Sequence, residues 1–341
     1  TEVPDGGYQG AYVDDLAKQV VAADPEIVRL PEPQRYEAFR EAGYALQLQQ
    51  QKDVLDNFNT HFDVWYSERS LHSSGAVERG FERLREQGHM FEADGAVWLR
   101  TTDFDDDKDR VLVKADGELT YFASDTAYYV DKRLRGFDVC IYLLGADHHG
   151  YIGRMMAMCA AFGDTPGTNM QILIGQLVNL VRNGVPVRMS KRAGTFVTLR
   201  DLLEEVGPDV VRFTMLTRKN DAPFDFDLVK ATEQSRDNPV WYVQYGHART
   251  RSVMRQAAAA GIPTEGLESV PLDRLADAGE LALIRLIAQW PRQVEAAAQA
   301  HEPHRIAFYL HELASSLHAR WTRGKDRPQL RFLNEERRDL T

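Results

Sequence analysis

The spacing of hydrophobic positions changes along the chain at about residue 237. Before it, short apolar runs alternate with stretches of helical periodicity, which is typical of an α/β domain with a mainly parallel sheet. After it, apolar residues recur only at helical spacing, in two sets: Leu283, Ile287, Trp290 and Val294, then Ile306, Leu310, Leu313 and Leu317. The pattern predicts an α/β domain over residues 1–237 and a helix bundle over residues 238–341. Asn238 can cap the first bundle helix, and Pro239 suits its first turn.

One apolar run leads directly into polar residues. Residues 139–144 are predicted to form a buried strand, followed by the loop Gly145-Ala146-Asp147-His148-His149-Gly150 and by a helix from about Tyr151 to Gly163. Open α/β sheets bind ligands beyond the carboxyl ends of their strands, which is where this loop would lie. Residues 172–174 and 177–181 are further strand-like pieces.

A hairpin is predicted earlier in the chain. Residues 111–113 and 119–122 flank Asp116-Gly117, a strong turn signal. Ser124-Asp125 then begins a helix that Gly136 closes.

Composition places the chain among ordinary globular proteins. Its 341 residues are 43% hydrophobic and 27% charged, enough for about two domains with cores of their own. The apolar runs are strand-sized, and no basic-then-apolar leader is visible, so we expect a cytoplasmic protein that does not enter a membrane. Cys140 and Cys159 have no metal-ligand spacing and are interpreted as buried thiols. The acidic residues 103–109 are interpreted as a solvated loop rather than a metal site.

Net charge gives little information about partners. A charge of −10 argues against a protein that coats nucleic acid indiscriminately, although a local basic face remains compatible with it. Basic residues cluster near the end of the chain: Arg320, Arg323, Lys325, Arg327, Arg331, Arg337 and Arg338. A solvated helix face explains this cluster about as well as RNA binding does.

The loop Arg188-Met189-Ser190-Lys191-Arg192 has the chemistry of a polyphosphate site. Lys191 can act as a point charge on a phosphate, while Ser190 and backbone N–H groups supply hydrogen-bond donors. It is not a Walker loop, because the required glycines and the Lys-Ser or Lys-Thr pair are missing.

The wider context of this loop resembles a known family. The run of residues 175–192, which includes Gly184-Val185-Pro186-Val187-Arg188-Met189-Ser190-Lys191, is similar to the second signature of class I aminoacyl-tRNA synthetases, and in particular of the arginyl-tRNA synthetase family of bacterial type. Leu143-Leu144-Gly145-Ala146-Asp147-His148-His149-Gly150, Asp131-Lys132-Arg133 and the run of residues 238–249 resemble the same family.

The resemblance implies a fold and an activity. The fold is a Rossmann-like class I catalytic domain, here residues 1–237 without its first part, followed by an all-α anticodon-binding bundle over residues 238–341. The activity is the condensation of L-arginine with ATP to arginyl adenylate, followed by transfer to tRNA(Arg). ATP with Mg²⁺ would be a substrate, no metal would be held by the protein itself, and the chain would be a monomer.

The resemblance also implies the residues that hold the ATP phosphates. Lys191 matches the second lysine of the family loop Lys-Met-Ser-Lys-Ser, with Ser190 and Met189 beside it. Arg188 replaces the first lysine, and a guanidinium keeps the charge but not the compact geometry of an ammonium.

For arginine, the resemblance places recognition at Glu68, Tyr121, Asp125 and His148. Two acids and a phenol can cradle a guanidinium, which lysine would leave partly unmatched. Each residue also has a structural alternative: Asp125 could cap its helix, Glu68 could be a surface acid and His148 a structural histidine.

For ATP and tRNA, the resemblance implies further positions. Those for ATP are Gly145, Asp147, His149, Gly175, Gln176, Val178 and Met189. A glycine such as Gly175 lets the base approach the backbone. Tyr245 and Arg249, one turn apart on the first bundle helix, could contact the anticodon stem and loop, with core packing of Tyr245 as the alternative.

One family signature is missing from these residues. The His-Ile-Gly-His motif, whose histidines stabilise the ATP phosphates, is not in the sequence. We therefore expect a fragment that does not form arginyl adenylate by itself. The main alternative function is a non-catalytic, synthetase-derived module that binds tRNA or a protein, and a second is a class I synthetase for another amino acid.

Overall fold

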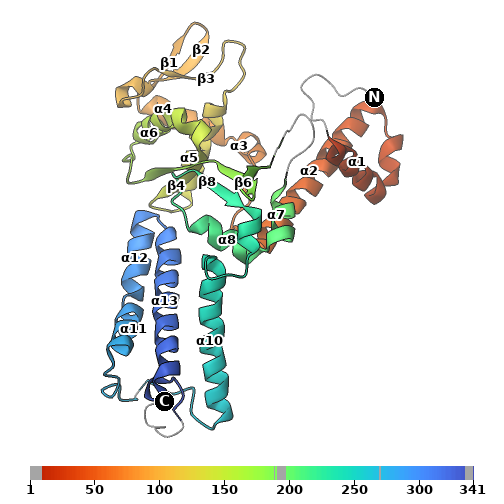
Figure 1. Ribbon diagram of the computed structural model, residues 1–341. Coiled ribbons are helices and arrows are strands. Elements are labelled where there is room, and N and C mark those ends of the chain that lie inside the picture. The colour runs from red at the N-terminus through yellow and green to blue at the C-terminus, as the bar shows by residue number, and fades with distance from the viewer. Residues whose placement is uncertain (1–9, 188, 190–196, 269, 335–340) are drawn as a thin grey trace. The chain divides into compact units, whose positions relative to one another are not determined.

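The computed structural model describes residues 10–187, 189, 197–268, 270–334 and 341 (Figure 1). It divides the chain into two compact units. One unit comprises Thr1–His61, Val178–Lys219 and Asp225–Thr341, and the other comprises Phe62–Leu177 and Asn220–Phe224.

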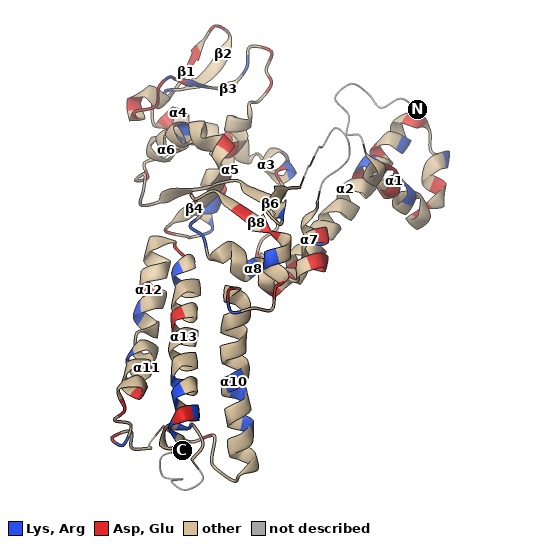
Figure 2. Cartoon of the chain, in the orientation of Figure 1, with Lys and Arg blue, Asp and Glu red and all other residues tan. Residues whose placement is uncertain are grey.

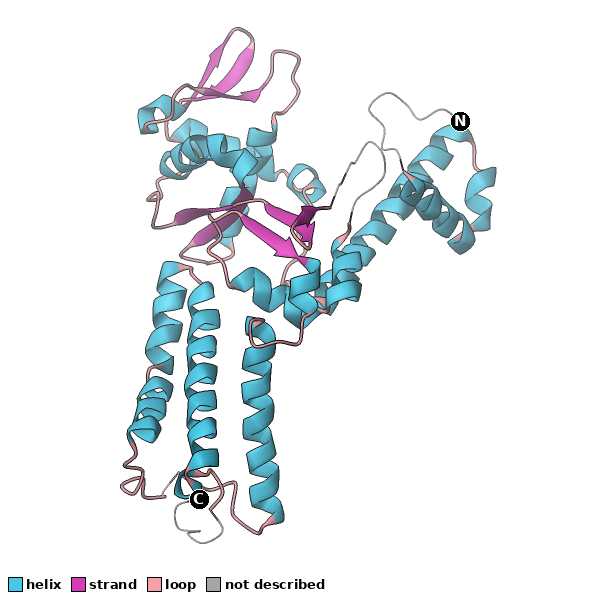
Figure 3. Ribbon diagram, in the orientation of Figure 1, coloured by secondary structure: helices cyan, strands magenta, loops and turns pink. Residues whose placement is uncertain are grey.

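The unit built on Phe62–Leu177 combines helices with two small sheets (Figure 3). Its α-helices are α3 (Arg69–Ser73), α4 (Ala76–Glu86), α5 (Tyr121–Leu134) and α6 (Ile152–Ala161). Its 3-10 helices are η2 (Thr101–Phe104) and η3 (Ala146–Tyr151). Its strands are β1 (Met90–Ala93), β2 (Ala96–Leu99), β3 (Arg110–Val113), β4 (Cys140–Gly145) and β5 (Met170–Gly175). The first three form an antiparallel sheet, and β4 pairs with β5 in parallel.

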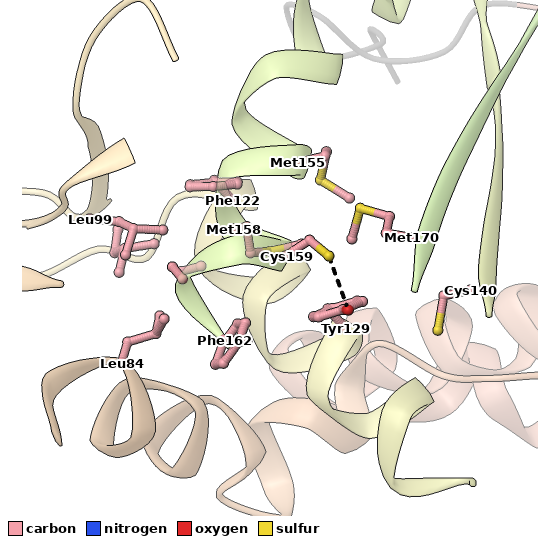
Figure 4. Packing of buried hydrophobic residues seen from close by; sticks show 13 residues of the cluster. Leu84, Leu99, Phe122, Tyr129, Cys140, Met155, Met158, Cys159, Phe162 and Met170 are labelled. Atoms are coloured by element: carbon pink, nitrogen blue, oxygen red, sulfur yellow. Dashed lines mark hydrogen bonds between the residues drawn. The ribbon is translucent and has the colours of Figure 1, made fainter. Parts of the chain in front are cut away.

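The core of this unit joins α4, α5 and α6 to both sheets (Figure 4). Leu84, Leu99 and Met158 are fully buried there, and burial of each such side chain contributes about 1.5–3 kcal/mol. The hydroxyl of Tyr129 donates to Asp164 at 2.6 Å and also lies 3.3 Å from the sulfur of Cys159. A polar network therefore fixes α5 and α6 to each other inside an apolar core.

Residues 139–144 were predicted to form a buried strand, and burial holds for only one face of that strand. Residues 140–145 form β4, but Ile141 is 45% and Leu143 75% exposed, while Cys140 on the other face is 6% exposed. Side chains alternate between the two faces of a strand, and in the described chain only one face of β4 packs on the core.

The second strand of the predicted hairpin, residues 119–122, extends too far. Val113 bridges Leu119 around Gly117, which has a φ of +86°, as the Asp-Gly signal indicates. Residues 121 and 122, however, are helical. The Thr120 side chain accepts a hydrogen bond from the N–H of Ala123, so it caps α5, which begins at Tyr121 rather than at Ser124. Gly136 follows the end of α5 at a φ of +86°, as predicted.

The acidic residues 103–109 are not simply a solvated loop. The Asp106 side chain is 4% exposed and forms two hydrogen bonds with Arg110, at 2.7 and 2.8 Å. The guanidinium of Arg110 satisfies a carboxylate that the fold has removed from water, which is why this acid could be buried.

The other unit is mostly helical. Its helices are α1 (Ala11–Ala23), η1 (Pro25–Arg29), α2 (Glu32–Asn57), α7 (Leu199–Val206), α8 (Pro208–Leu216), α9 (Leu228–Thr232), α10 (Pro239–Ala259), α11 (Ala278–Ala288), α12 (Trp290–Ala300), α13 (His304–Asp326) and η4 (Pro328–Leu330). Strands β6 (Val178–Arg182), β7 (Val185–Pro186) and β8 (Phe224–Asp227) form a sheet in the order β7-β6-β8, and β8 begins at the last residue of the other unit.

The predicted helix bundle after residue 237 is confirmed for the described residues. α13 packs against α10, α11 and α12. The side chain of Asn238 accepts from the N–H of Val240 at 3.1 Å, and Pro239 is the first residue of α10, so the cap and the first turn are as expected.

One apolar stripe of the bundle differs from its prediction. Ile287, Trp290 and Val294 fall on two helices, α11 and α12, and are 41–53% exposed, whereas Leu286 is buried. Pro291 in the first turn of α12 lacks the N–H that a continuous helix would need.

Some classes of feature are missing from the described residues. None of their helices is both long and apolar enough to cross a membrane. They hold no group of three or more His, Cys, Asp or Glu side chains placed to bind a metal ion. Cys140 and Cys159 are free and buried, as predicted.

Candidate functional site

A cavity of about 230 Å³ lies in the unit built on Phe62–Leu177. Seven residues line it: Tyr66, Glu68, Leu71, Tyr121, Ser124, Asp125 and Tyr128. Three of the four residues assigned to arginine recognition, Glu68, Tyr121 and Asp125, therefore meet at one cavity although the first and the last are 57 positions apart.

Local structure explains how these side chains meet. Tyr121 and Asp125 lie one turn apart on α5 and so share a helix face. Glu68 is the residue before α3, and that helix is anchored by Leu71, which is 1% exposed. Because Thr120 caps α5, Asp125 sits in the helix interior and the interpretation of Asp125 as a cap is wrong.

The two acids of the cavity lack a protein partner. Among the described residues, no side chain or N–H group donates a hydrogen bond to the carboxylate of Glu68 or of Asp125, and neither forms an ion pair. Burial is the largest effect on the pKa of Asp125 and raises it, and the charge of Glu68 raises it further. The charges of Lys132 and Arg154 lower it. A half-buried carboxylate without a partner is costly, so the cavity favours a cationic ligand.

Aromatic rings form one side of the cavity. The rings of Tyr66 and Tyr128 stack with centroids 4.5 Å apart, and the guanidinium of Arg135 lies 4.9 Å from the Tyr66 ring. The Tyr121 side chain is 82% exposed and lies at the rim. Tyrosine rings therefore line the cavity beside its two acids.

A second cluster lies at the carboxyl ends of β4 and β5. Gly145 and Gly175 are register partners at these ends, so two of the residues assigned to ATP lie together. A Cβ on Gly145 would lie 2.5 Å from Oδ1 of Asp147, so glycine leaves room for this side chain to fold back on the strand end. The Gln176 N–H donates to the carbonyl of Asn220 at 2.7 Å.

The two histidines of this loop are exposed. His148 Nε2 lies 3.6 Å from Asp147 Oδ2, and its ring meets Tyr151 edge-on at 5.8 Å. His148 does not line the 230 Å³ cavity, so it stands apart from the other three residues assigned to arginine. His149 has no described contact that would mark it as structural.

The remaining assigned residues belong to the other unit. Val178 begins β6 and is 40% exposed, and Met189 is 48% exposed. Arg188, Ser190 and Lys191 lie outside the described residues.

Tyr245 and Arg249 share one face of α10, as their spacing predicts. Tyr245 is 46% exposed, with its ring 5.4 Å from that of His318. The ring of Tyr245 is therefore partly packed and partly exposed, and its contact with tRNA stays a prediction.

Sequence reasoning missed part of the cavity. Tyr66 and Tyr128 were not singled out, and Lys132 behind them was named only in the run Asp131-Lys132-Arg133 that resembles the family. A usable signal existed for two of them, because Tyr128 and Lys132 follow Asp125 at three and seven residues, which is one face of a helix.

Comparisons with known proteins show the family to which both parts of the chain are similar. Residues 31–222 match the family model described as tRNA synthetases class I (R), catalytic domain, and residues 243–340 match the DALR anticodon binding domain. An arginine–tRNA ligase of Frankia alni is 52% identical over 317 residues, which is 93% of this chain and 57% of that protein. One of Kineococcus radiotolerans is 52% identical over 315 residues, 92% of this chain and 56% of that protein.

Solved structures show the same fold. A Campylobacter jejuni structure described as an arginyl-tRNA synthetase has a TM-score of 0.86 at 30% identity, covering 100% of this chain and 72% of that one. The Thermus thermophilus arginyl-tRNA synthetase has a TM-score of 0.69 at 22% identity, covering 88% and 60%.

Fold and matches together define a class I aminoacyl-tRNA synthetase catalytic region with a helical anticodon-binding domain. The chain belongs to the arginyl-tRNA synthetase family of that class. It spans about 57% of the length of the Frankia alni relative.

Proposed function

We propose that the protein carrying this chain is an arginine–tRNA ligase, which activates L-arginine with ATP and transfers it to tRNA(Arg). One observation carries the proposal: the carboxylates of Glu68 and Asp125 line one cavity beside Tyr121 and have no partner among the described residues. A guanidinium offers five donors in a fixed plane and can satisfy both acids at once. The relatives named arginine–tRNA ligase support the same assignment.

The reaction would divide between two sets of residues. The cavity would hold the arginine side chain, and Gly145, Gly175 and the neighbouring loop residues would hold ATP. An oxygen of the arginine carboxylate attacks the α-phosphorus of ATP, the bond to the β-phosphate oxygen breaks, and pyrophosphate leaves. Lys191 and Ser190, with Mg²⁺ that accompanies ATP, would stabilise the charge on pyrophosphate, so catalysis rests on positioning and electrostatics.

For tRNA, we propose residues 238–341 as the anticodon-binding domain and residues 1–237 as the catalytic part. α10 carries Arg249, Arg251 and Arg255 and no acid, so Figure 2 draws it only in blue and tan. A helix with this charge favours contact with phosphates even in a chain whose net charge is −10. We propose further that the protein acts as a monomer in the cytoplasm, where proteins are synthesised.

The sequence holds the loop around Lys191 but no His-Ile-Gly-His motif. We therefore expect that the 341-residue polypeptide by itself does not form arginyl adenylate, because half of the family's phosphate-binding residues are missing from it. Arginine-dependent exchange of pyrophosphate into ATP by this polypeptide, at a rate usual for synthetases, would contradict this expectation.

Ligand binding tests the assignment of the cavity. We expect calorimetry with the 341-residue polypeptide to detect L-arginine and not L-citrulline, which has the same shape but no charge. L-lysine should bind at least about tenfold more weakly, because an ammonium cannot satisfy both acids in one plane. Equal affinities for the three ligands would sink the proposal.

Two variants locate that binding. Asp125→Asn and Glu68→Gln should each weaken arginine binding by about ten- to a hundredfold, the weight of a hydrogen bond to a charged group. Asp63→Asn removes an exposed acid outside the cavity and is the matched control. A non-catalytic module that binds only tRNA or protein would show no arginine binding in any of these proteins.

A further inference from the structure

Lys132 is held in an unusual place on α5. Its Nζ lies 3.6 Å from the centre of the Tyr128 ring on the same helix and 3.9 Å from the centre of the Tyr142 ring on β4. Among the described residues, the ammonium has no hydrogen-bond acceptor and no ion-pair partner. Two aromatic faces are thus its main neighbours, and we refer to Tyr128 and Tyr142 as the tyrosine cage.

This arrangement is costly for the fold. Burial lowers the pKa of Lys132 to about 8, since an ammonium away from water loses its hydration. Contacts with two aromatic faces compensate for only part of the lost hydration free energy. The hydroxyl of Tyr142 is also buried and finds no hydrogen-bond partner in the part of the chain that the structure describes. An uncharged side chain at position 132 would avoid most of this cost, which points to a use for the charge.

The cage adjoins the arginine cavity through Tyr128. This residue lines the cavity and stacks on Tyr66, and it also contacts the ammonium of Lys132. Asp125 and Lys132 are two turns apart on one face of α5, with Tyr128 between them. The charge of Lys132 favours the ionised form of Asp125 more than that of Arg154 does.

Charge balance suggests what the cation does. Two ionised acids and one bound guanidinium would leave a net charge of −1 in a half-buried site, and two acids alone would leave −2. Lys132 and Arg154 are the two cations that act on Asp125, and Lys132 acts on it more strongly. A lysine free to move would instead pair with Asp125 and fill the site, whereas an ammonium held between two rings cannot.

We propose that Lys132 is a positioning residue for arginine recognition: its caged ammonium balances the charge of Asp125 from behind Tyr128, and the tyrosine cage keeps that ammonium out of the cavity. The inference rests on the proposed function, because it assumes that the cavity binds arginine. It adds a residue that lies outside the cavity and acts on Asp125, which lines it.

The groups that could change the charge of Lys132 come from two elements. They are Asp125, Tyr128, Asp131 and Arg135 on α5, and Cys140 and Tyr142 on β4. Asp131 is paired with Arg135, so it does not neutralise Lys132. Asp125 is therefore the unpaired carboxylate of the cavity that Lys132 can balance.

The test measures L-arginine binding to the 341-residue polypeptide by calorimetry between pH 5 and pH 8. Lys132→Met should weaken binding by a factor that grows toward pH 5. As the pH is lowered, its affinity should begin to fall at a higher pH than in the wild type, because Asp125 takes up its proton more readily. Lys132→Arg keeps the charge and can stack on both rings, so it should stay within about threefold of the wild type.

Two cage variants complete the test. Tyr142→Leu opens the cage while keeping Lys132, and arginine binding should fall because the ammonium can now reach Asp125. Tyr142→Phe removes only the unpaired hydroxyl and is the matched control, with binding unchanged. Wild-type binding by Lys132→Met at every pH, or equal losses in Lys132→Met and Lys132→Arg, would overturn the inference. No arginine binding by the wild type would overturn the proposed function as well, so the two failures can be told apart.

Discussion

Arg249 donates a hydrogen bond from Nη2 to the hydroxyl of Tyr245 at 2.8 Å, and its Cζ lies 4.1 Å from the centre of the same ring. Its Nη1 donates to Nδ1 of His318 at 2.9 Å, and the guanidinium also lies 4.9 Å from the ring of Trp321. Arg249 is thereby bound to α13 by contacts that hold the bundle together. Of the two residues assigned to tRNA, Tyr245 is therefore the one whose exposed side chain we expect to contact RNA.

We expect Tyr245→Ala to weaken binding of a tRNA(Arg) transcript by about tenfold or more, since one base stacked on an aromatic ring contributes about 1–3 kcal/mol. Tyr245→Phe keeps the ring and should bind nearly as the wild type does. Filter binding at fixed salt measures both. Phe308 on α13 is 56% exposed, and Phe308→Ala is the control for loss of an aromatic ring from the same bundle. Equal losses in the two alanine variants would contradict a specific role for Tyr245.

The ion pair of Asp106 and Arg110 should make a measurable contribution to stability. Arg110 is the largest cause that lowers the pKa of Asp106, from 3.8 to about 2, against the opposing effect of burial. The folded state thus favours the carboxylate by about 2 kcal/mol, and Asp106→Asn should lose roughly that much in urea unfolding at pH 7.

The pH dependence of this loss has a definite sign. A lowered pKa stabilises the fold fully above 3.8 and loses its effect as the pH falls toward 2, so the gap between the wild type and Asp106→Asn should narrow below pH 4. Asp107→Asn is the matched control, because Asp107 contacts the same arginine but is 73% exposed and should contribute at most about 1 kcal/mol. A constant gap from pH 7 to pH 3 would contradict this account.

Local signals predicted the elements whose ends are determined by neighbouring residues. Asn238-Pro239 marked the start of α10, Gly136 the end of α5 and Asp116-Gly117 the turn before it. In each case a side chain or a positive φ acts within a few residues, so the sequence contains the cause.

Features that depend on distant residues were not predictable in this way. The exposed face of β4 depends on what covers the sheet, and periodicity does not reveal that. Burial of Asp106 depended on its pairing with Arg110. The place of Lys132 required β4 to bring Tyr142 next to α5. Glu68, Tyr121 and Asp125, which line the cavity, were assigned to arginine recognition from family resemblance. No spacing in the sequence would have joined Glu68 to Asp125.

The two cysteines should be unreactive until the protein unfolds. Cys159 is fully buried and Cys140 is 6% exposed, and burial raises the pKa of both thiols. The thiolate is the reactive form, so both access and chemistry are lowered. We expect a thiol reagent to modify neither cysteine in the native protein at pH 8 and both in denaturant. Ser73→Cys adds an exposed thiol that reports the intrinsic rate, and modification of native Cys159 at that rate would show that the core opens.

Asp125 should lower the stability of the folded protein at neutral pH, although the same carboxylate contributes to arginine binding. Burial and Glu68 raise its pKa although Lys132 and Arg154 oppose them, so the folded chain holds this proton more tightly than the unfolded chain. The sign follows: the penalty is absent below the ordinary pKa of an aspartate and complete once the pH has risen through the raised value. At pH 7, Asp125→Asn should therefore raise the melting temperature, by about 2–4 °C for each kcal/mol regained, while it weakens arginine binding. L-arginine at about the wild-type dissociation constant should raise the melting temperature of the wild type and leave that of Asp125→Asn nearly unchanged. Asp63→Asn should change neither quantity. A lower melting temperature for Asp125→Asn without ligand would show that Asp125 has a stabilising partner, and the cavity would then need another explanation.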